Sequence, residues 1–550
     1  MGEAALDVRR AGTDGLLAEV ADLDQALALF ASLRDRPPVG VWELVPAART
    51  VLVRFDPART SAEALTADLA SRPRTGTAAV DGPVVEVPVC YDGEDLDEVA
   101  RLCGLDAAEV VRRHTAHPWT VAFTGFAPGF GYLSGGDPAL DVPRRTEPRT
   151  AIPAGSVGLA GRFSGIYPRA SPGGWQLLGR TGLVLWDQRR ADPALLAPGV
   201  RVQFVDAGPD ALTITGGAED ASPTSPGAGA PGAGPAGAPA LEVLSPGPLT
   251  VVVDLGRPGR AAQGVARSGA VDRASLRRAN RLVGNPSATA ALEVAVGGLR
   301  VRALTDLVVA VTGASTPLTL LTPAQSAEPG DGGGPDDDEG DLVEREVGRD
   351  RAFVLARGAE LHLGQPVRGM VSHLAVAGGV EGEPVLGSLS TDLLSGIGPG
   401  PLRAGDVVRV GGAREAAAAV DPEPGPQLPG SDDVTSIDVL LGPRDDWFTE
   451  EGLRTFLDQE WSVTPRSNRV GLRLEGEQPL ERSRTDELPS EGTVPGSVQV
   501  PPNGQPVVFT ADHPVTGGYP VVACVARHDL DRVGQVPVGG RIRFRVTDRT

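Results

Sequence analysis

Polar side chains between residues 445 and 519 are of the types that could bind and polarise an amide. The set comprises Asp445, Asp446, Ser467, Asn468, Arg469, Glu491, Gln499, Asn503, Gln505, Asp512, His513 and Tyr519. Carboxylate, amide and guanidinium groups that share the mouth of a barrel could bind a lactam or an amide and stabilise charge developing on its carbonyl oxygen. We assign catalytic roles to Asp445, Glu491 and Asp512. Substrate-binding roles go to Arg469, Gln499, Asn503 and Tyr519, and no metal ligand is assigned.

A second stretch, residues 123–181, holds glycine and proline too densely for a helix. We expect short strands joined by tight turns, with backbone and aromatic rings lining a concave surface that suits a small polar ligand. The arginines that could supply positive charge for an anionic substrate are Arg144, Arg145, Arg149, Arg162 and Arg169. Most arginines are solvated surface residues, so for each of these five a role in ligand binding and a role on the surface both stay open.

Phrases from the same stretch recur near the C-terminus. GYLSG (131–135), PAGSV (153–157) and PGGWQLLGRT (172–181) correspond to GLRLEG (471–476), VPGSV (494–498) and TGGYPVVACV (516–525). The spacing between the phrases agrees as well, which predicts one β module used twice. The alternative is that glycine-rich hairpins resemble one another by chance.

Longer phrases point to a family. Those of the first half read GFAPGFGYL, PRTAIPAGSVGLAG and SPGGWQLLGRT. They resemble the family called allophanate hydrolase subunit 1, which is similar to the B-type subunit of prokaryotic ATP-dependent 5-oxoprolinase. Those of the second half include SGAVDRASLRRANRLVGNPSATAALEV, LGSLSTDLLSGIG, SNRVGLRLEG and TVPGSVQVPPNGQPVVFTADHPVTGGYP. They resemble allophanate hydrolase subunit 2, or the C-type subunit of the same enzyme, so the chain looks like a B–C fusion.

The resemblance adds candidate substrate-binding residues. It implies that three turns of the first half belong to a shared pocket surface, and we predict ligand contacts there for Phe130, Tyr132, Gly155, Ser156, Gly174 and Trp175. In the second half the family phrase carries Ser268, Asp272 and Asn280. A helix cap and a solvated helix face explain two of these equally well. Glu293 is an isolated charge in an apolar stretch and needs a partner or a ligand.

The resemblance also implies a function. It is the opening of the 5-oxoproline lactam to glutamate, with ATP and Mg as co-substrate of a complex that requires a separate 5-oxoprolinase A-type subunit. One alternative is the carboxyltransferase part of urea carboxylase, acting on urea or a related amide with a biotin carrier in trans. Another is a regulator of a sporulation histidine kinase, which fusion of the two halves disfavours. His513–Pro514 stands where relatives usually show an Arg-Gln-type pair, which puts substrate specificity in doubt.

Composition excludes several classes of function. The net charge of −20 argues against a nucleic-acid partner. Every basic residue other than histidine is arginine, so the chain has no Walker A loop, no Schiff-base lysine and no biotinylated lysine. GxSxG and HExxH signatures are missing too. Without a signal core or a long apolar run, we expect a cytoplasmic protein with no membrane contact, and a homo-oligomer stays open.

We predict a mainly β fold with an α+β part. It would have cyclophilin-like β-barrel modules and an N-terminal ferredoxin-like domain with the order β-α-β-β-α-β, its last strand at 84–91. The predicted divisions are an N-terminal α+β domain at 1–85, a cyclophilin-like domain at 86–210, a flexible linker at 217–240, the first part of the subunit 2 region at 241–415, and a second cyclophilin-like module at 434–550. The acidic segment 325–347 is expected to be a disordered insertion. His114 and His117 are expected to contact helix-end carbonyls rather than a metal.

Overall fold

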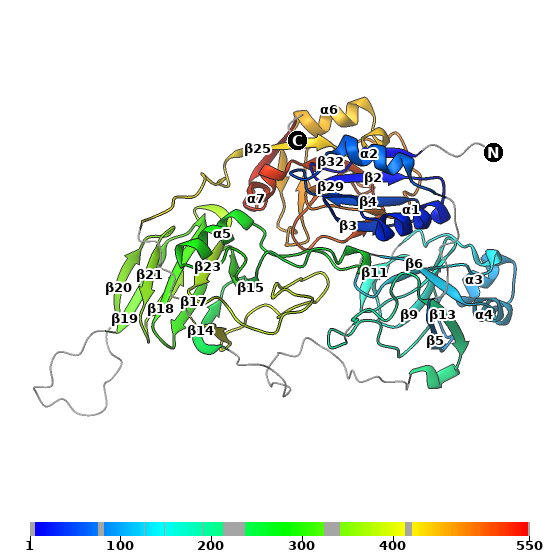
Figure 1. The fold of residues 1–550 in the computed structure, drawn as a ribbon, viewed down its shortest axis with the longest axis horizontal. Coiled ribbons are helices and arrows are strands. Elements are labelled where there is room, and N and C mark those ends of the chain that lie inside the picture. Colours follow the sequence, from blue (N-terminus) through cyan, green and yellow to red (C-terminus); the bar gives the residue numbers. More distant parts are fainter. Residues whose placement is uncertain are drawn as a thin grey trace, which may run out of the picture.

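The computed structural model describes residues 6–547 except 75–81, 126, 148, 191, 213–236, 324–341 and 413–420. Strands dominate and helices are few, as predicted (Figure 1). The predicted linker lies almost wholly outside the described residues, and so does most of the predicted acidic insertion. Its last residues differ from the prediction, because Leu342–Val347 forms a strand, β20, that pairs with β19 (Leu318–Pro323).

The N-terminal unit is a four-stranded antiparallel sheet, ordered β1-β2-β4-β3, with two helices. Its elements are β1 (Asp7–Arg10), β2 (Gly15–Glu19), α1 (Leu23–Asp35), β3 (Val41–Pro46), β4 (Thr50–Phe55) and α2 (Ala62–Ser71). The α+β prediction is confirmed, but the predicted element order is wrong. The edge position that we gave to the strand after α2 is occupied by β1, so the sheet has the ferredoxin-like arrangement with a permuted chain order.

The strand predicted to complete that sheet, β5 (Val84–Val89), instead pairs in parallel with β13 (Arg201–Asp206). It belongs to a seven-stranded sheet ordered β12-β9-β10-β7-β6-β13-β5. The other strands are β6 (Trp119–Thr124), β7 (Gly131–Ser134), β9 (Ser156–Ala160), β10 (Phe163–Ile166) and β12 (Gln176–Arg180), with a small pair β8 (Arg149–Ile152) and β11 (Ser171–Gly173). A bridge between Cys90 and Arg180 joins the two edges. This sheet therefore closes as a first barrel, with α3 (Leu96–Cys103) and α4 (Ala107–Thr115) at one end.

The C-terminal barrel repeats this plan. It is closed in the order β25-β32-β29-β30-β27-β26-β33, with β25 parallel to β33 just as β5 is to β13. Its elements are β25 (Val434–Leu441), η4 (Asp445–Trp447), α6 (Glu450–Asp458), β26 (Trp461–Val463), β27 (Gly471–Glu475), β28 (Glu491–Gly492), β29 (Ser497–Gln499), β30 (Val507–Phe509), β31 (Thr516–Gly517), β32 (Val521–Val525), α7 (Leu530–Val533) and β33 (Arg541–Val546).

Local details of the two barrels agree as well. Trp119 starts β6 and donates from Nε1 to the His114 carbonyl at 3.0 Å. Trp461 starts β26 and donates in the same way to the Phe456 carbonyl, also at 3.0 Å. The three pairs of repeated phrases fall on equivalent strands, so the predicted repeat is confirmed.

A β-sandwich lies between the barrels in the sequence. One sheet has the order β20-β19-β22-β17-β14-β24 and the other β15-β16-β23-β18-β21, with an apolar core between them. The strands not yet defined are β14 (Ala238–Pro246), β15 (Leu249–Val253), β16 (Ala291–Ala295), β17 (Leu299–Ala303), β18 (Leu307–Ser315), β21 (Ala352–Leu355), β22 (Glu360–Leu363), β23 (Arg368–Val376) and β24 (Val407–Val410). Helix α5 (Arg273–Leu282) covers β18 and β23, where its apolar stripe is buried.

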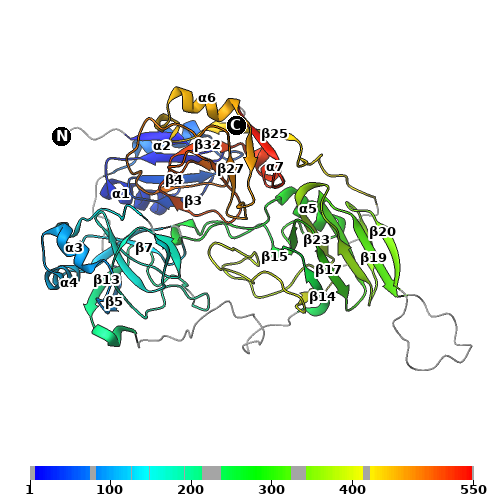
Figure 2. The ribbon, with the colours of Figure 1, turned by 180° about the vertical axis from the view of Figure 1, so that it is seen from behind.

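The N-terminal sheet packs on the C-terminal barrel, although the two lie at opposite ends of the sequence (Figures 1 and 2). Their shared apolar cluster includes Leu17, Val45, Leu52, Val494, Val521 and Cys524. Because β4 alternates, Leu52 faces the barrel while its neighbours Val51 and Val53 face the helices. Burial raises the pKa of the Cys524 thiol to about 12, as expected for a structural cysteine.

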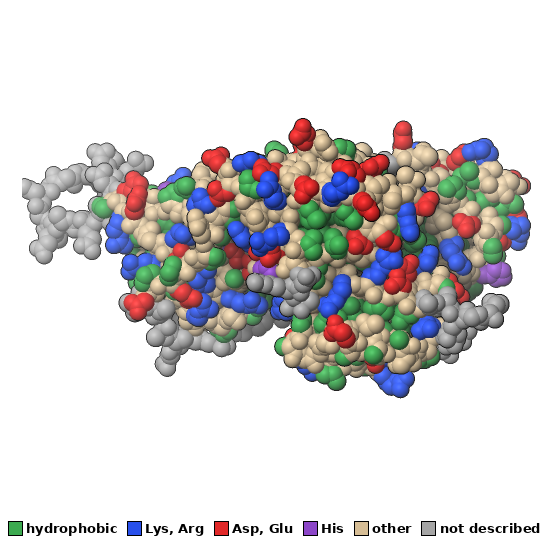
Figure 3. Space-filling view, turned by 90° about the horizontal axis from the view of Figure 1, so that it is seen from above, with side chains coloured by type: hydrophobic (Ala, Val, Ile, Leu, Met, Phe, Trp, Pro, Cys, Tyr) green, Lys and Arg blue, Asp and Glu red, His purple; other side chains and the backbone are tan. Residues whose placement is uncertain are grey.

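Two surface properties bear on partners. In the described part of the chain, no helix has both the length and the apolar character needed to cross a bilayer. Basic and acidic side chains are interspersed over the face shown in Figure 3.

The expectation for His114 is wrong. Its side chain is fully buried in the first barrel, 2.7 Å from the Tyr91 hydroxyl and 2.9 Å from that of Ser164. Burial lowers the pKa of His114 to about 3, so it is a neutral core residue. His117 is exposed at the end of the same helical segment.

Candidate functional site

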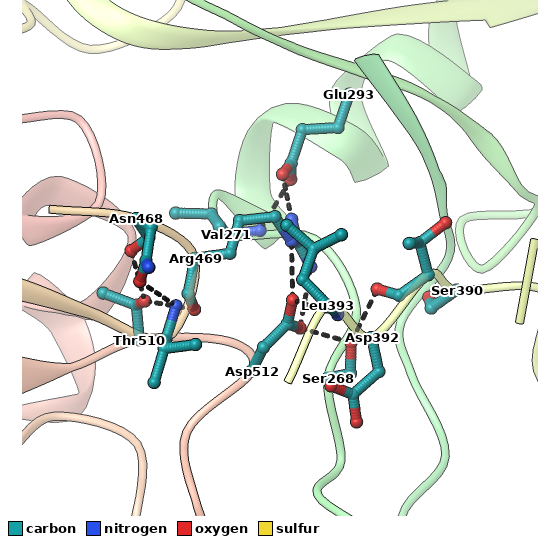
Figure 4. A network of polar contacts seen from close by, with 12 residues as sticks. Ser268, Val271, Glu293, Ser390, Asp392, Leu393, Asn468, Arg469, Thr510 and Asp512 are labelled. Atoms are coloured by element: carbon teal, nitrogen blue, oxygen red, sulfur yellow. Dashed lines mark hydrogen bonds and ion pairs between the residues drawn. The ribbon is translucent and has the colours of Figure 1, made fainter. Parts of the chain in front are cut away.

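A buried polar network joins the C-terminal barrel to the sandwich, with Asp512 at its centre (Figure 4). Asp512 has no exposed surface. Its Oδ1 lies 2.6 Å from the Ser268 hydroxyl and 3.0 Å from Nη2 of Arg469. Its Oδ2 accepts from Nε of Arg469 at 2.9 Å and from the Leu393 backbone N–H at 3.0 Å. Each carboxylate oxygen therefore has two hydrogen-bond donors already. Asp512 is suited to hold the network in place and not to act as a base.

Arg469 connects Asp512 to Glu293. Its Nη1 pairs with Glu293, and its Nη2 also donates to the Gly269 carbonyl at 2.8 Å. The other oxygen of Glu293 accepts from the Val271 N–H at 2.8 Å and lies 3.3 Å from Nε2 of His373. Burial raises the pKa of Glu293, but the charge of Arg469, the contact with His373 and the Val271 N–H together outweigh this and lower it to about 2. The isolated charge noticed in the sequence is thus paired.

Ser268 is held in a strained conformation by the same network. Its φ of 54° lies in the left-handed region, which few residues other than glycine adopt. Its hydroxyl is 2.6 Å from Asp512 and 3.1 Å from the Thr391 carbonyl, and can donate to either. A strain of this kind costs about 1–3 kcal/mol and is found where surrounding contacts impose it, frequently at functional sites.

Asp392 adds a carboxyl group with spare hydrogen-bonding capacity. It is 1% exposed, and its Oδ1 accepts from the Ser395 N–H at 2.9 Å. Its Oδ2 has no hydrogen-bond partner among the described residues. Burial first, and then the nearby Asp512 charge, raise the pKa of Asp392 to about 6. A carboxyl group with a free oxygen and this pKa is suited to exchange a proton near neutral pH.

Arg257 contacts the backbone two residues before Asp392 and is 1% exposed. Its Nη2 donates to the Ser390 carbonyl and its Nε to the Val385 carbonyl at 3.4 Å. Its Nη1 has no partner in the described part of the chain. Burial lowers the pKa of Arg257, and the charge of Asp392 opposes that shift. Arg257 therefore has an unused hydrogen-bond donor, and Asp392 has an unused acceptor.

The other two predicted catalytic residues lie elsewhere. Glu491, on β28, is 5% exposed and pairs with Arg444, which also binds Glu19 at 2.7 Å. Burial raises the pKa of Glu491, against the effect of Arg444. This trio connects the barrel to the N-terminal sheet. Asp445 is half-buried at the start of η4, outside the network around Asp512.

The predicted aromatic residues of the first barrel are buried outside its core cluster, packed with Leu23 and Ala48 of the N-terminal unit, instead of lining an open surface. Phe130, Tyr132 and Trp175 are at most 6% exposed and meet edge to face, with ring centroids 5.2–5.4 Å apart. Tyr132 reaches the second barrel, where its hydroxyl lies 3.2 Å from that of Ser490. Three further predicted residues are held mainly by backbone contacts: Gly155 turns at φ +81°, Ser156 starts β9, and Gly174 accepts from the Arg145 N–H at 2.8 Å.

The remaining predicted residues do not converge. Asp272 caps α5 and binds Ser275 and Gln535. The helix-cap interpretation therefore fits Asp272, but the solvated-face interpretation is wrong for Asn280, which is fully buried and bonds to Thr289 and Asn285. Gln499 donates to the Tyr519 carbonyl at 3.1 Å, while the Tyr519 ring is 45% exposed and Asn503 lies in an exposed turn. Of the predicted set, the network brings together Ser268, Arg469 and Asp512.

Sequence reasoning missed Asp392, Arg257 and His373. Asp392 lies in GSLSTDLLSG, where an aspartate after serine and threonine looks like a turn or helix cap. The signal that could have found it is its position in a family phrase, combined with the apolar leucines on both sides. Arg257 had the same signal in the phrase DLGRPGR.

One group among the described residues has the composition of a metal site: Asp438, His528 and Asp529. Nε2 of His528 lies 3.1 Å from Asp438, and Asp438 also accepts from Nε of Arg545 at 2.7 Å. Asp529 accepts from the Asp438 backbone N–H at 2.7 Å. These oxygens already have donors, so we interpret the group as an ion-pair cluster.

Two family models match the chain in its two halves. The carboxyltransferase domain, subdomains C and D, matches residues 6–196, and the carboxyltransferase domain, subdomains A and B, matches residues 263–546. The chain belongs to the carboxyltransferase-domain family. It joins in one polypeptide the two parts that the models describe separately.

Relatives of this carboxyltransferase-domain protein fall into two groups. It is 36% identical to the C subunit of 5-oxoprolinase from Escherichia coli (strain K12), over 55% of this chain and 90% of that protein. It is 50% identical to the B subunit of 5-oxoprolinase from Escherichia coli O157:H7, over 22% of this chain and 57% of that protein. It is also 31% identical to the urea amidolyase of Saccharomyces cerevisiae, over 56% of this chain but only 16% of that much longer protein.

A solved structure has the same arrangement throughout. The crystal structure of TTHA0988 superposes with a TM-score of 0.78 at 36% identity, covering 98% of this chain and all of the other. The combination of both halves is therefore found in a second protein. The predicted family and the mainly β fold with barrels are both confirmed.

Proposed function

We propose that this carboxyltransferase-domain protein is a fused B–C component of an ATP-dependent 5-oxoprolinase, opening 5-oxoproline to glutamate with a separate A-type subunit. Its similarity to the B and C subunits of that enzyme supports the proposal. The single observation that carries the chemistry is the buried Asp392, which has a free oxygen and whose neighbours Thr391 and Leu393 contact Ser268 and Asp512. ATP with Mg²⁺ is the co-substrate of the complex, and the absence of lysine rules out a Walker A loop on this chain.

The difficulty of the reaction lies in the lactam, whose carbonyl carbon is a poor electrophile. Attack of the carbonyl oxygen on the γ-phosphorus of ATP releases ADP and forms an O-phosphorylated imidate, and the amide nitrogen loses its proton. Asp392 is suited to accept that proton because its pKa is near 6. Water then adds across the C=N bond, and the C–N bond breaks as the proton of the new hydroxyl and the proton held by Asp392 pass to nitrogen, which leaves an acyl phosphate and an ammonium group. A second water releases phosphate and leaves glutamate.

Arg469 and Asp512 are positioning residues in this mechanism. They fix the strained Ser268 and, through the Leu393 N–H, the backbone beside Asp392. A buried and fully paired network is rigid, so it keeps the reacting groups in place without reorganisation.

The test is release of phosphate and glutamate from ATP and 5-oxoproline. We expect turnover when this chain is mixed with an A-type subunit, and little from either alone. Asp392→Asn should reduce kcat by at least 10²-fold, whereas Asp445→Asn should change it less than two-fold. Full activity of this chain alone would refute the division of labour between the two proteins.

A second function is tested in the same way, because the family models describe carboxyltransferase subdomains and urea amidolyase is a relative. In that case a biotin carrier in trans would deliver the carboxyl group to urea or a related amide. Urea-dependent carboxylation with a biotinylated carrier, together with no activity on 5-oxoproline, would favour it.

A further inference from the structure

Three polar groups at the junction of the two halves have buried hydrogen-bonding atoms without a partner in the described part of the chain. They are Nε of Arg169, Nη1 of Arg257 and Oδ2 of Asp392. Arg169 follows β10 of the first barrel, whereas the other two belong to the second half. Buried polar atoms are nearly always satisfied in folded proteins, so a shared set of unsatisfied ones calls for a ligand.

Asp392 starts a tight hairpin that Arg169 contacts, and Arg257 binds the Ser390 carbonyl just before it. The Asp392 N–H donates to the Ile397 carbonyl at 2.9 Å, and the Gly396 N–H donates to the Asp392 carbonyl at 2.8 Å. Arg169 lies against the Gly396 end, where a Cβ atom built on the glycine would be 3.6 Å from its Nη1. Gln188, also from the first half, donates to the Gly396 carbonyl at 3.2 Å. The first half therefore contacts the segment that carries Asp392.

The charges of these groups interact. Burial lowers the pKa of both Arg169 and Arg257, and for each of them the nearby Asp392 charge opposes the shift. Two cations, one from each half of the chain, thus interact with the charge of one carboxylate. They leave two guanidinium donors and one carboxylate acceptor available.

We propose that Arg169, Arg257 and Asp392 form one binding site, assembled from both halves, for a small cyclic amide that carries a carboxylate. The inference rests on the proposed function and deepens it. The two guanidinium groups would bind the carboxylate, and the free oxygen of Asp392 would accept the amide N–H. Urea has no carboxylate and would leave both cations unpaired, so this chemistry favours 5-oxoproline over urea.

A cleft lies near the same junction, although Arg169, Arg257 and Asp392 are not among the residues that line it. It has a volume of about 700 Å³ and is lined by residues 186–189 of the first half and by residues of the second half. Its wall includes Gly398 and Pro399, which directly follow the hairpin. Volumes in this range are typical of small-molecule sites.

The experiment compares two lactams that differ only in the carboxylate. Binding of 5-oxoproline and of 2-pyrrolidinone to the full chain is measured by calorimetry, and KM is measured in the complex with the A-type subunit. We expect Arg169→Gln to weaken 5-oxoproline binding at least ten-fold and to leave 2-pyrrolidinone binding unchanged. Arg162→Gln is the matched control, because Arg162 is an exposed arginine of the same barrel.

Each outcome decides a different point. If Arg169→Gln keeps the wild-type preference for 5-oxoproline, the composite site is wrong even when turnover of the two-protein complex supports the proposed function. If the wild-type chain binds 5-oxoproline with this preference but shows no turnover, the function fails and the site stands. If 5-oxoproline neither binds nor reacts, both are overturned. Should Arg169→Gln misfold, Arg169→Lys tests the same preference while retaining the charge.

Discussion

The hydroxyl of Ser268 lies 2.6 Å from the carboxylate of Asp512, although the two residues are 244 positions apart. Ser268 lies between β15 and α5 of the sandwich unit, and Asp512 follows β30 of the C-terminal barrel. Their contact joins two folding units at the point where the backbone of Ser268 is strained. The buried charges around this contact make the junction sensitive to single substitutions.

Replacing Arg469 should be severely destabilising. Arg469→Gln leaves Asp512 and Glu293 as buried carboxylates that have lost their shared cation. Removing one partner of a buried ion pair costs about 3–5 kcal/mol. We expect a loss of that size in the free energy of unfolding from urea titration. Arg466→Gln, an exposed arginine in the same loop, is the control and should change stability by less than about 0.5 kcal/mol. Equal effects of the two variants would show that the network does not stabilise the fold.

The difference in stability between the wild type and Asp392→Asn should change with pH in a defined direction. The folded-state pKa of Asp392 is about 6, above the value of about 4 for an unfolded aspartate. The stabilisation from its protonated form is therefore complete below pH 4 and is lost as pH rises through 6. Asparagine does not titrate. The free energy of unfolding of the variant should therefore rise by roughly 2–3 kcal/mol relative to that of the wild type between pH 4 and 7. Urea titrations across this range measure the difference, and a constant difference would contradict the raised pKa.

Glu491 was predicted to be catalytic, but its contacts indicate that it stabilises the fold. A substitution can separate these two roles. Glu491→Gln weakens the contact with Arg444, which keeps its second partner Glu19. We expect a loss of about 1.5–3 kcal/mol in stability, typical of a hydrogen bond to a charged group. The kcat of the folded variant, measured in the complex with the A-type subunit, should stay within two-fold of the wild type. A fall of 10³-fold without loss of stability would return Glu491 to the catalytic set.

The sequence was most informative where local patterns determine the fold. The repeated phrases fall on equivalent strands because the same turns need the same residues, as with Gly155 and Gly496 at φ values of +81° and +84°. The permuted N-terminal sheet was missed because β1 is a short polar edge strand, DVRR, without apolar alternation. The pairing of Arg469 with Glu293 spans 176 positions, and no spacing rule reaches that far. Asp392 was missed for the same reason, since its role depends on neighbours from three distant segments.

The packing of the N-terminal sheet on the C-terminal barrel predicts that the halves stay together after the chain is cut. A protease site inserted between residues 217 and 236 would separate the two family regions covalently. The apolar cluster around Leu52 and the ion pair of Arg444 with Glu19 cross this division. We therefore expect the cleaved protein to elute as one species in size-exclusion chromatography at micromolar concentration. Leu52→Ala removes a side chain with no exposed surface from this interface, at a cost of about 2–5 kcal/mol, and should raise the dissociation constant of the halves by at least 10-fold. Separation of the wild-type halves at that concentration would mean that the contacts between them are too weak to assemble a shared site without the covalent link.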